Sequence, residues 1–256
     1  MHQVPPRRAA PLGRALAFMR AGMVATADAA TPIEPGIVVS TPSLPAVWAV
    51  NQLRITPPLT FDELVGLADA HQAGSEYRHV AVEHQQAGPG LEQAFRTAGW
   101  KVERDVVMVL SEPADRRADP DVAEDAGEDE MLELMRRWYE GDEEPDEIDQ
   151  LVDYSRRESH ALGDRLLGVR SGDGRLVAIT KLRSDGRIAQ VEDVYTVPEA
   201  RGRGFARALL SRAAELAREG GDDLVFIVAD DADWPKLLYE RLGFRSAGFL
   251  WQFHRD

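Results

Sequence analysis

The chain has 256 residues, enough for one large hydrophobic core or two modest ones. Hydrophobic residues make up 44% and charged residues 29%, as in ordinary globular proteins, and no apolar stretch approaches the length of a membrane span. Cysteine is absent, which excludes disulfides, thiolate zinc sites and a cysteine acyl-enzyme. The six histidines show no metal-ligand spacing, so no metal is expected.

The formal net charge of −14 is concentrated in one segment. Residues 112–150 hold 17 acidic and 4 basic side chains, whereas the rest of the chain is nearly neutral. Nucleic acid is not an expected partner, because nonspecific binding depends on basic side chains that neutralise phosphates. The acidic segment is either a solvated linker with exposed helix faces or an acidic rim that attracts a cationic amine.

The first half of the chain begins with a Pro/Arg-rich tail and a short helix near residues 12–25. Arg20 interrupts the apolar run there, so we expect no secretion signal and a cytoplasmic location. Apolar patterning then predicts strands at 36–40 and 47–55, a helix at 61–70, a strand at 77–82, a helix within 91–100 and a strand at 105–110. The polar, proline-interrupted segment 113–121 is the expected linker.

The second half contains a glycine-rich turn between an apolar strand, which ends at Pro198, and a long apolar-striped helix. Such turns let main-chain N–H groups at a helix start converge on a phosphate. Gly202 and Gly204 allow close approach because they lack a Cβ, and Arg201 and Arg203 can add charge-assisted hydrogen bonds.

Downstream, residues 224–229 form an apolar run of strand length, and Asp230-Asp-Ala-Asp233 is a helix-start signal. Pro235 suits the first turn of the helix, and Gly243 suits its end.

Arg201-x-x-Gly204-x-Ala206, preceded by Val194-x-Thr196 and Pro198, resembles the acetyl-CoA pyrophosphate loop of the GNAT superfamily of N-acetyltransferases. The segment from Tyr239 to Phe244 resembles the Tyr-x-x-x-Gly-Phe ending of that family. The turn fits neither a Walker loop nor a dinucleotide fingerprint.

This resemblance implies an α/β (α+β) fold with a mixed, mostly antiparallel central sheet flanked by helices. It implies acetyl-CoA as co-substrate, without a metal, and helices near 128–139 and 146–161 that border the acceptor cleft. Tyr239 is then the acid that protonates the CoA thiolate, and Asp230 or Asp231 takes the place of the family's usual asparagine contact to pantetheine. The implied cofactor-binding residues are Val194, Tyr195, Thr196, Val197, Arg201, Gly202, Arg203, Gly204, Phe205, Ala206, Asp230 and Asp231.

An amine must lose a proton before it attacks a thioester, so the reaction needs a base. Glu192 and Asp193 lie side by side in the strand before the loop. Since neighbouring residues of a strand face opposite sides, we expect only one of them to face the acceptor cleft. Glu192 shares the parity of Thr196, whereas Asp193 stands at a place where the family often has an acid; both stay candidates, as does a purely structural role for the pair.

The first half echoes the second. Phe95 stands four residues before Gly99-Trp100, as Tyr239 stands four before Gly243-Phe244, and a strand flanks the helix on each side. We interpret this as a weak internal repeat: a tail with a short helix at 1–30, a degenerate GNAT-like lobe at 31–112, a linker at 113–121 and a catalytic GNAT lobe at 122–256. The alternative for the first half is an unrelated small α/β domain.

The sequence thus predicts an N-acetyltransferase that moves an acetyl group from acetyl-CoA directly to a primary amine. The acceptor is a small molecule or peptide, neither nucleic acid nor membrane is an expected partner, and a homodimer is compatible with the chain. One alternative is a non-catalytic acyl-CoA-binding or sensing module, and another is an α/β domain that binds no nucleotide.

Overall fold

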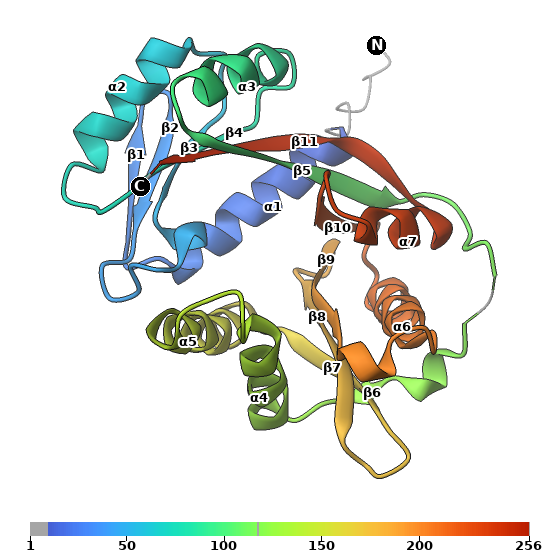
Figure 1. Cartoon of the computed structure of the whole chain (residues 1–256). Coiled ribbons are helices and arrows are strands. Elements are labelled where there is room, and N and C mark those ends of the chain that lie inside the picture. The colour runs from blue at the N-terminus through green and yellow to red at the C-terminus, as the bar shows by residue number, and fades with distance from the viewer. Residues whose placement is uncertain (1–9, 117, 256) are drawn as a thin grey trace, which may run out of the picture.

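The computed structural model describes residues 10–116 and 118–255. Residues 1–9 of the predicted tail and Arg117 of the predicted linker lie outside the described residues. Within the described ranges, eleven strands form one sheet with helices on its faces (Figure 1). In this part of the chain two neighbouring pairs of strands are parallel and the other pairs are antiparallel. The predicted fold class is therefore confirmed.

The elements follow the predicted succession closely. The first half contains α1 (Pro11–Thr26), β1 (Ala29–Ile33), β2 (Gly36–Ser40), the 3₁₀ turn η1 (Trp48–Val50), β3 (Gln52–Ile55), α2 (Phe61–His71), β4 (Arg78–Val82), α3 (Gly88–Thr97) and β5 (Lys101–Leu110). The second half contains η2 (Pro120–Val122), β6 (Glu124–Asp125), α4 (Glu128–Tyr139), α5 (Pro145–Leu162), β7 (Arg165–Arg170), β8 (Leu176–Ser184), β9 (Ile188–Thr196), η3 (Pro198–Ala200), α6 (Phe205–Glu219), β10 (Leu224–Asp230), α7 (Pro235–Arg241) and β11 (Phe244–Arg255).

The last strand of the chain is inserted into the first half. The strand order is β1-β2-β3-β4-β11-β5-β10-β9-β8-β7-β6, so β11 lies between β4 and β5. The long β5/β11 ladder crosses the molecule, with the parallel pair β3/β4 beyond β11 and the parallel pair β9/β10 beyond β5 (Figure 1). The linker therefore divides the sequence but not the sheet, and the interpretation as two tandem lobes stays a prediction.

Helix α1 ties the two halves together. Its residues Ala15 and Leu16 are buried against Val107 and Phe226, at the centre of the sheet. Its charged side chains contact both halves, since Arg14 forms an ion pair with Asp223 of the second half and Arg20 forms one with Glu83 of the first. The side chains of the first half are therefore held in a fixed position next to those of the second.

Helices α4 and α5 cover the sheet face that will form the site. α4 buries Met131, Leu132, Leu134 and Met135 on one side, and its first turn carries three acidic residues, which the positive end of the helix dipole favours. α5 begins with a capping box between Glu144 and Glu147 and ends at Gly163, whose φ of 67° is left-handed. The predicted ranges of both helices are confirmed.

Candidate active site

The glycine-rich segment forms the turn between β9 and α6. Gly202 and Gly204 have φ values of 78° and 85°, in the left-handed region that favours glycine. Gly204 is the N-cap of α6, where no side chain caps the helix and the first turn carries no acidic residue. The first N–H groups of a helix lack intrahelical partners, and a Cβ on either glycine would meet no described atom within 4 Å. The turn therefore offers an open anion site.

The two loop arginines lie beside this turn and are exposed. Arg201 donates from Nε to the carbonyl of Thr196 at 3.1 Å, and Arg203 donates from Nη2 to the carbonyl of Glu199 at 3.5 Å. A guanidinium has five N–H donors, so these single contacts leave donors for a phosphate. Charge and uncapped amides thus occur together at the start of α6.

Strands β9 and β10 separate just before the turn. They pair in parallel only from Ile188 to Val191, opposite Leu224 to Ile227. β10 continues to Asp230, but those residues pair with β5 on its other side. The edge of β9 from Glu192 to Thr196 that faces β10 is consequently open, and it leads to the glycine turn. This is the strand on which the sequence predicted main-chain pairing with pantetheine.

A β-bulge in β9 changes which side chains face the cleft. The register with β8 shifts between Ile179 and Lys181, and Asp193 has a φ of 53°, the only positive value at a non-glycine residue in the described chain. Thr180 fills the irregularity by donating from its hydroxyl to the carbonyl of Glu192 at 2.7 Å. The bulge adds one residue to the strand and so breaks the alternation of side chains.

The expectation that Glu192 and Asp193 face opposite sides is wrong. Glu192 lies opposite Lys181 in the ladder, which places both on one face, and Asp193 contacts the same lysine. Beyond the bulge, Tyr195 faces α4 and α5 while Val194 packs on the α6 side. For the same reason, the side chains of Glu192 and Thr196 do not face the same side of the strand. Glu192 and Asp193 both line the cleft.

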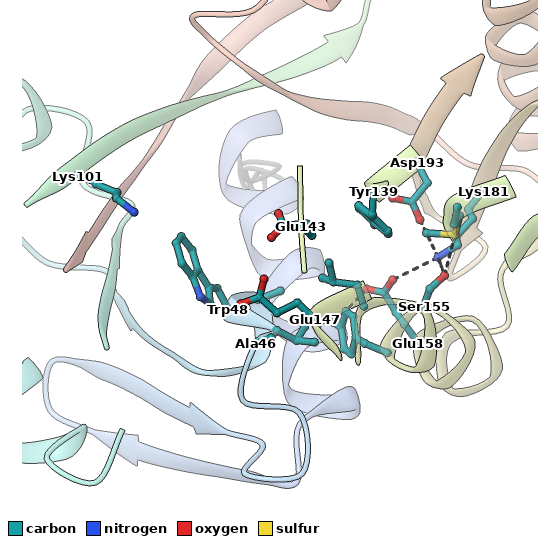
Figure 2. Close-up of a pocket in the computed structure, with 15 residues that line it drawn as sticks. Ala46, Trp48, Lys101, Tyr139, Glu143, Glu147, Ser155, Glu158, Lys181 and Asp193 are labelled. Atoms are coloured by element: carbon teal, nitrogen blue, oxygen red, sulfur yellow. Dashed lines mark hydrogen bonds and ion pairs between the residues drawn. The ribbon is translucent and has the colours of Figure 1, made fainter. Parts of the chain in front are cut away.

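Asp193 belongs to a buried ion network (Figure 2). Lys181 is 1% exposed, and its Nζ lies 2.7 Å from Oδ2 of Asp193 and 2.7 Å from the Ser155 hydroxyl, to which it donates. Glu158 lies 3.8 Å from the same nitrogen and 3.0 Å from Arg183. Burial alone would lower the pKa of Lys181, but the carboxylates of Asp193 and Glu158 outweigh it and raise that pKa. Asp193 is therefore primarily the counter-ion of a buried cation.

Glu192 is in a different electrostatic environment. Burial raises the pKa of its carboxyl from 4.5 to about 8; Arg183 opposes this rise, and Asp193 adds to it. Gln190 donates from Nε2 to its Oε1. A carboxylate whose pKa lies near neutrality can both take up and release a proton, which is the requirement for a general base.

Tyr239 lies in the core cluster that packs against α6. It is 6% exposed, and its ring lies 6.3 Å from that of Phe244. Burial raises the pKa of its phenol well above the usual value, and the Glu192 carboxyl raises it further. The phenol is therefore protonated at neutral pH, and its role as the acid stays a prediction.

The other predicted cofactor residues are placed as follows. Tyr195 stacks on Trp138 with ring centroids 5.0 Å apart, and Val197 is buried; Phe205 packs between two core clusters. Ala206 lies half-buried in the first turn of α6. The hydroxyl of Thr196 is buried without a hydrogen-bond partner in the described chain.

The two aspartates after β10 have protein partners. Asp231 forms ion pairs with Arg104 and, at 2.8 Å, with Lys236, and the hydrogen bond from Lys236 lowers the pKa of its carboxyl most. Asp230 accepts from the amide of Ala232 at 2.7 Å. These contacts hold the β10–α7 turn, and a contact of either aspartate with the cofactor stays a prediction.

Two adjoining cavities, of about 590 and 310 Å³, open beside the bulge. They share Trp48, Ala49, Tyr154 and Glu158. The larger cavity contains Asp193 and Lys181, together with the acidic α5 side chains of Glu147 and Glu158 (Figure 2). The smaller cavity contains Glu192 and Arg183.

Sequence reasoning missed several of these cleft residues. Lys181 had a detectable signal, because it is a charged residue inside an apolar strand. Trp48 had none, since it comes from the first half and reaches the site because β11 and α1 join the halves.

Within residues 10–116 and 118–255, no group of three or more acidic or histidine side chains is arranged to hold a metal ion. In the same ranges, no helix combines the length and apolar character that a membrane crossing requires.

Comparison with known proteins gives a family and a fold. Residues 129–244 match the Acetyltransferase (GNAT) family. A functionally unknown conserved protein from Staphylococcus epidermidis ATCC 12228 is 14% identical with a TM-score of 0.69, over 88% of this chain and 92% of that chain. A GCN5-related N-acetyltransferase from Kribbella flavida is 18% identical with a TM-score of 0.65, over 97% of each chain.

A tandem GNAT protein from the clavulanic acid biosynthesis pathway, solved without AcCoA, is 14% identical with a TM-score of 0.52, over 74% of this chain and 67% of that chain. At these identities the likeness shows the fold. The chain is an acyltransferase whose residues 129–244 belong to the GNAT family of acetyltransferases.

Proposed function

We propose that this protein transfers an acetyl group directly from acetyl-CoA to a primary amine of a small molecule or peptide. The observation that carries the proposal is the open edge of β9, which leads into the uncapped start of α6. The amide groups of an extended pantetheine arm can pair with the open edge of β9, and a diphosphate can bind at the uncapped start of α6. A cytoplasmic location, and acceptors other than nucleic acid, are part of the proposal.

The helix that connects the parallel pair of the first half, α2, has no such opening. At the start of α2, the Glu63 carboxylate accepts from the amide of Thr60 at 2.8 Å and so closes the helix end with a negative charge. The strands also stay joined, because the amide of Glu83 donates to the carbonyl of Ile55 at 3.0 Å, beyond the last paired residues. We therefore assign acetyl-CoA to the second half.

The larger cavity suits a cationic acceptor. Glu143, Glu147 and Glu158 line it together with Asp193. Burial, and next the neighbouring Glu147, raise the pKa of Glu143, which indicates crowded negative charge. A positively charged amine relieves this crowding as it enters. The acidic segment of the sequence is, on this proposal, a rim of the acceptor cleft.

Glu192 is the proposed base. Acetyl-CoA supplies the activated thioester. Glu192 removes a proton from the ammonium group, and the nitrogen then forms its bond to the acetyl carbon as the carbon–sulfur bond breaks. Asp193 forms an ion pair with Lys181, which balances the charge of the buried lysine and stabilises the bulge.

Tyr239 is the proposed acid. Its phenol gives a proton to the departing thiolate, and the second proton that the nitrogen loses as the amide forms restores the phenol. Each turnover then leaves one proton on Glu192, which passes to solvent. Positioning of the two substrates contributes about 7–11 kcal/mol when the alignment is good. Proton transfer by such side chains is typically worth about 10²–10⁴-fold.

Tyr239→Phe is expected to lower kcat by about 10²–10⁴-fold, because the thiolate must then leave unprotonated. The affinity for CoA should change little, since the ring and its packing against Phe244 are retained. Steady-state kinetics and calorimetry on the same preparation measure the two effects. An unchanged kcat removes Tyr239 from the mechanism.

The function itself is tested by the release of CoA thiol from acetyl-CoA in the presence of a panel of amines. Thiol release that rises with amine concentration supports the transferase. Tight binding of CoA without turnover on any amine supports the alternative, a non-catalytic acyl-CoA sensor.

A further inference from the structure

The smaller cavity lies where the two halves meet, and its floor is the sheet. Gln52 and Arg54 come from β3, Gln252 and His254 from β11, and Gln190 and Glu192 from β9. The catalytic carboxyl and the polar side chains of the first half therefore border one space of about 310 Å³.

Besides His254, three of these side chains carry buried polar atoms without a hydrogen-bond partner in the described part of the chain. The atoms are Oε1 of Gln52, Nη2 of Arg54 and Oε1 of Gln190. Their residues are 4%, 4% and 2% exposed. Folded proteins rarely leave buried polar atoms unsatisfied, and each such atom needs an explanation. Three in one cavity indicate a ligand.

Each of these three side chains donates a hydrogen bond from a second side-chain atom, a nitrogen. Gln52 donates from Nε2 to the carbonyl of Ala49 at 2.8 Å, and Arg54 donates from Nε to Glu83 at 2.7 Å. Gln190 donates from Nε2 to Glu192. The unpartnered atoms are thus held in place before any ligand arrives, and such preorganisation favours binding.

The wall of the cavity continues into the larger one through Trp48. Its ring lies 4.4 Å from that of His254, and it lines both cavities. Nδ1 of His254 is likewise buried without a hydrogen-bond partner among the residues described. An amine that enters past the acidic side chains of α5 can therefore reach the polar floor.

The unpartnered atoms define the chemistry of the ligand. The two amide oxygens accept hydrogen bonds, whereas the guanidinium nitrogen donates one. A hydroxyl group both donates and accepts, so one kind of group satisfies all three. An alkyl or aromatic substituent would displace water and leave these atoms unsatisfied.

Resting on the proposed function, we propose that this cavity is the acceptor subsite and that it takes a small amine carrying hydroxyl groups. The amine lies at Glu192, and the hydroxyl groups lie against Gln52, Arg54 and Gln190. The first half of the chain then determines acceptor specificity, while the second half holds acetyl-CoA.

The test compares glucosamine with cyclohexylamine, two ring amines of which only the first carries hydroxyl groups. Rates are expressed per protonated amine, the form that Glu192 deprotonates in the proposed function, so that the different protonated fractions of the two amines do not enter. The wild-type protein should favour glucosamine in kcat/KM by at least about 10²-fold, because sites built to bind hydroxyl groups strongly reject analogues without them.

Gln52→Leu should lower kcat/KM for glucosamine by about 10-fold or more and leave cyclohexylamine unchanged or improved. Gln93→Leu is the matched control: this glutamine is exposed on α3 and lines neither cavity, so both rates should stay as in the wild type. Calorimetric titration of glucosamine into the CoA-saturated protein gives a second readout, and Gln52→Leu should weaken that binding.

Equal kcat/KM values for the two amines in the wild type would overturn the inference and leave the transferase function standing. A folded Gln52→Leu protein that loses both activities equally would also overturn it, because the glutamine would then be structural. Absence of both CoA binding and thiol release in the wild type would instead overturn the proposed function.

Discussion

Gly204→Val is expected to abolish CoA binding while the protein stays folded. Gly204 has a φ of 85°, where a β-branched residue is strained, so the turn must change its shape. The valine side chain would also occupy the open space in front of the first amides of α6. We expect calorimetry to show a loss of at least about 10²-fold in CoA affinity, corresponding to about 2.7 kcal/mol or more.

Gly221→Val is the control for strain alone. Gly221 follows the other end of α6, has a φ of 88°, and its Cβ would also meet no described atom within 4 Å. Both variants should lose comparable thermal stability, but Gly221→Val should bind CoA normally. Normal CoA affinity in Gly204→Val would refute the role of the turn.

Glu192→Gln is expected to lower kcat by about 10²–10⁴-fold and to change the pH profile. The base acts when it is deprotonated, and its pKa is about 8. In the wild type, kcat/KM for the amine should therefore rise about tenfold per pH unit below pH 8 and level off above it. With the same amine, kcat/KM of the variant should change with pH only through the titration of the acceptor amine itself.

Asp193→Asn separates the two candidate bases. This change leaves buried Lys181 without its nearest carboxylate, so the variant should lose stability. It should keep the rise of kcat/KM towards pH 8. If Asp193→Asn loses this rise and Glu192→Gln keeps it, Asp193 is the base.

The same carboxyl gives a readout that needs no substrate. The folded-state pKa of Glu192 is raised from 4.5 to about 8, so its contribution to stability is fully present below pH 4.5 and is lost as the pH rises through 8. Glu192→Gln should therefore become more stable relative to the wild type between pH 5 and pH 9. A constant difference in melting temperature over that range would contradict the raised pKa.

Local sequence signals predicted the elements that position the cofactor. The glycines and the apolar stripe defined the start of α6, and capping signals defined the ends of its neighbours. The helix predicted at 128–139 agrees with α4 at both ends. These elements follow from short-range patterns, which a single sequence contains.

The secondary structure predicted from local patterns differs from the structure in two places. Residues 47–55 were expected to form one strand, but they begin with η1, because the side-chain amide of Asn51 donates to the carbonyls of Leu44 and Val47 and curls the chain. β1 was not predicted, since its sequence of Ala29 to Ile33 contains a proline and is mostly exposed, as an edge strand can be.

The arrangement of the candidate site depended on contacts that no local pattern reveals. The bulge at Asp193 arises where Thr180 of the neighbouring strand binds the carbonyl of Glu192. Phe95, the counterpart of Tyr239 in the predicted repeat, lies in a packed core, stacked on Phe253 at 4.0 Å. Trp48, Gln52 and Arg54 come from the first half, which the insertion of β11 between β4 and β5 and the packing of α1 join to the second.

The role of the main chain in CoA binding can be measured by amide hydrogen exchange with and without CoA, which reports on the N–H groups themselves. We expect CoA to slow exchange in two adjoining segments, 192–197 on the open edge of β9 and 202–206 at the start of α6, and to leave exchange at the start of α2 unchanged. If CoA binds and exchange slows in neither segment, the cofactor site lies elsewhere.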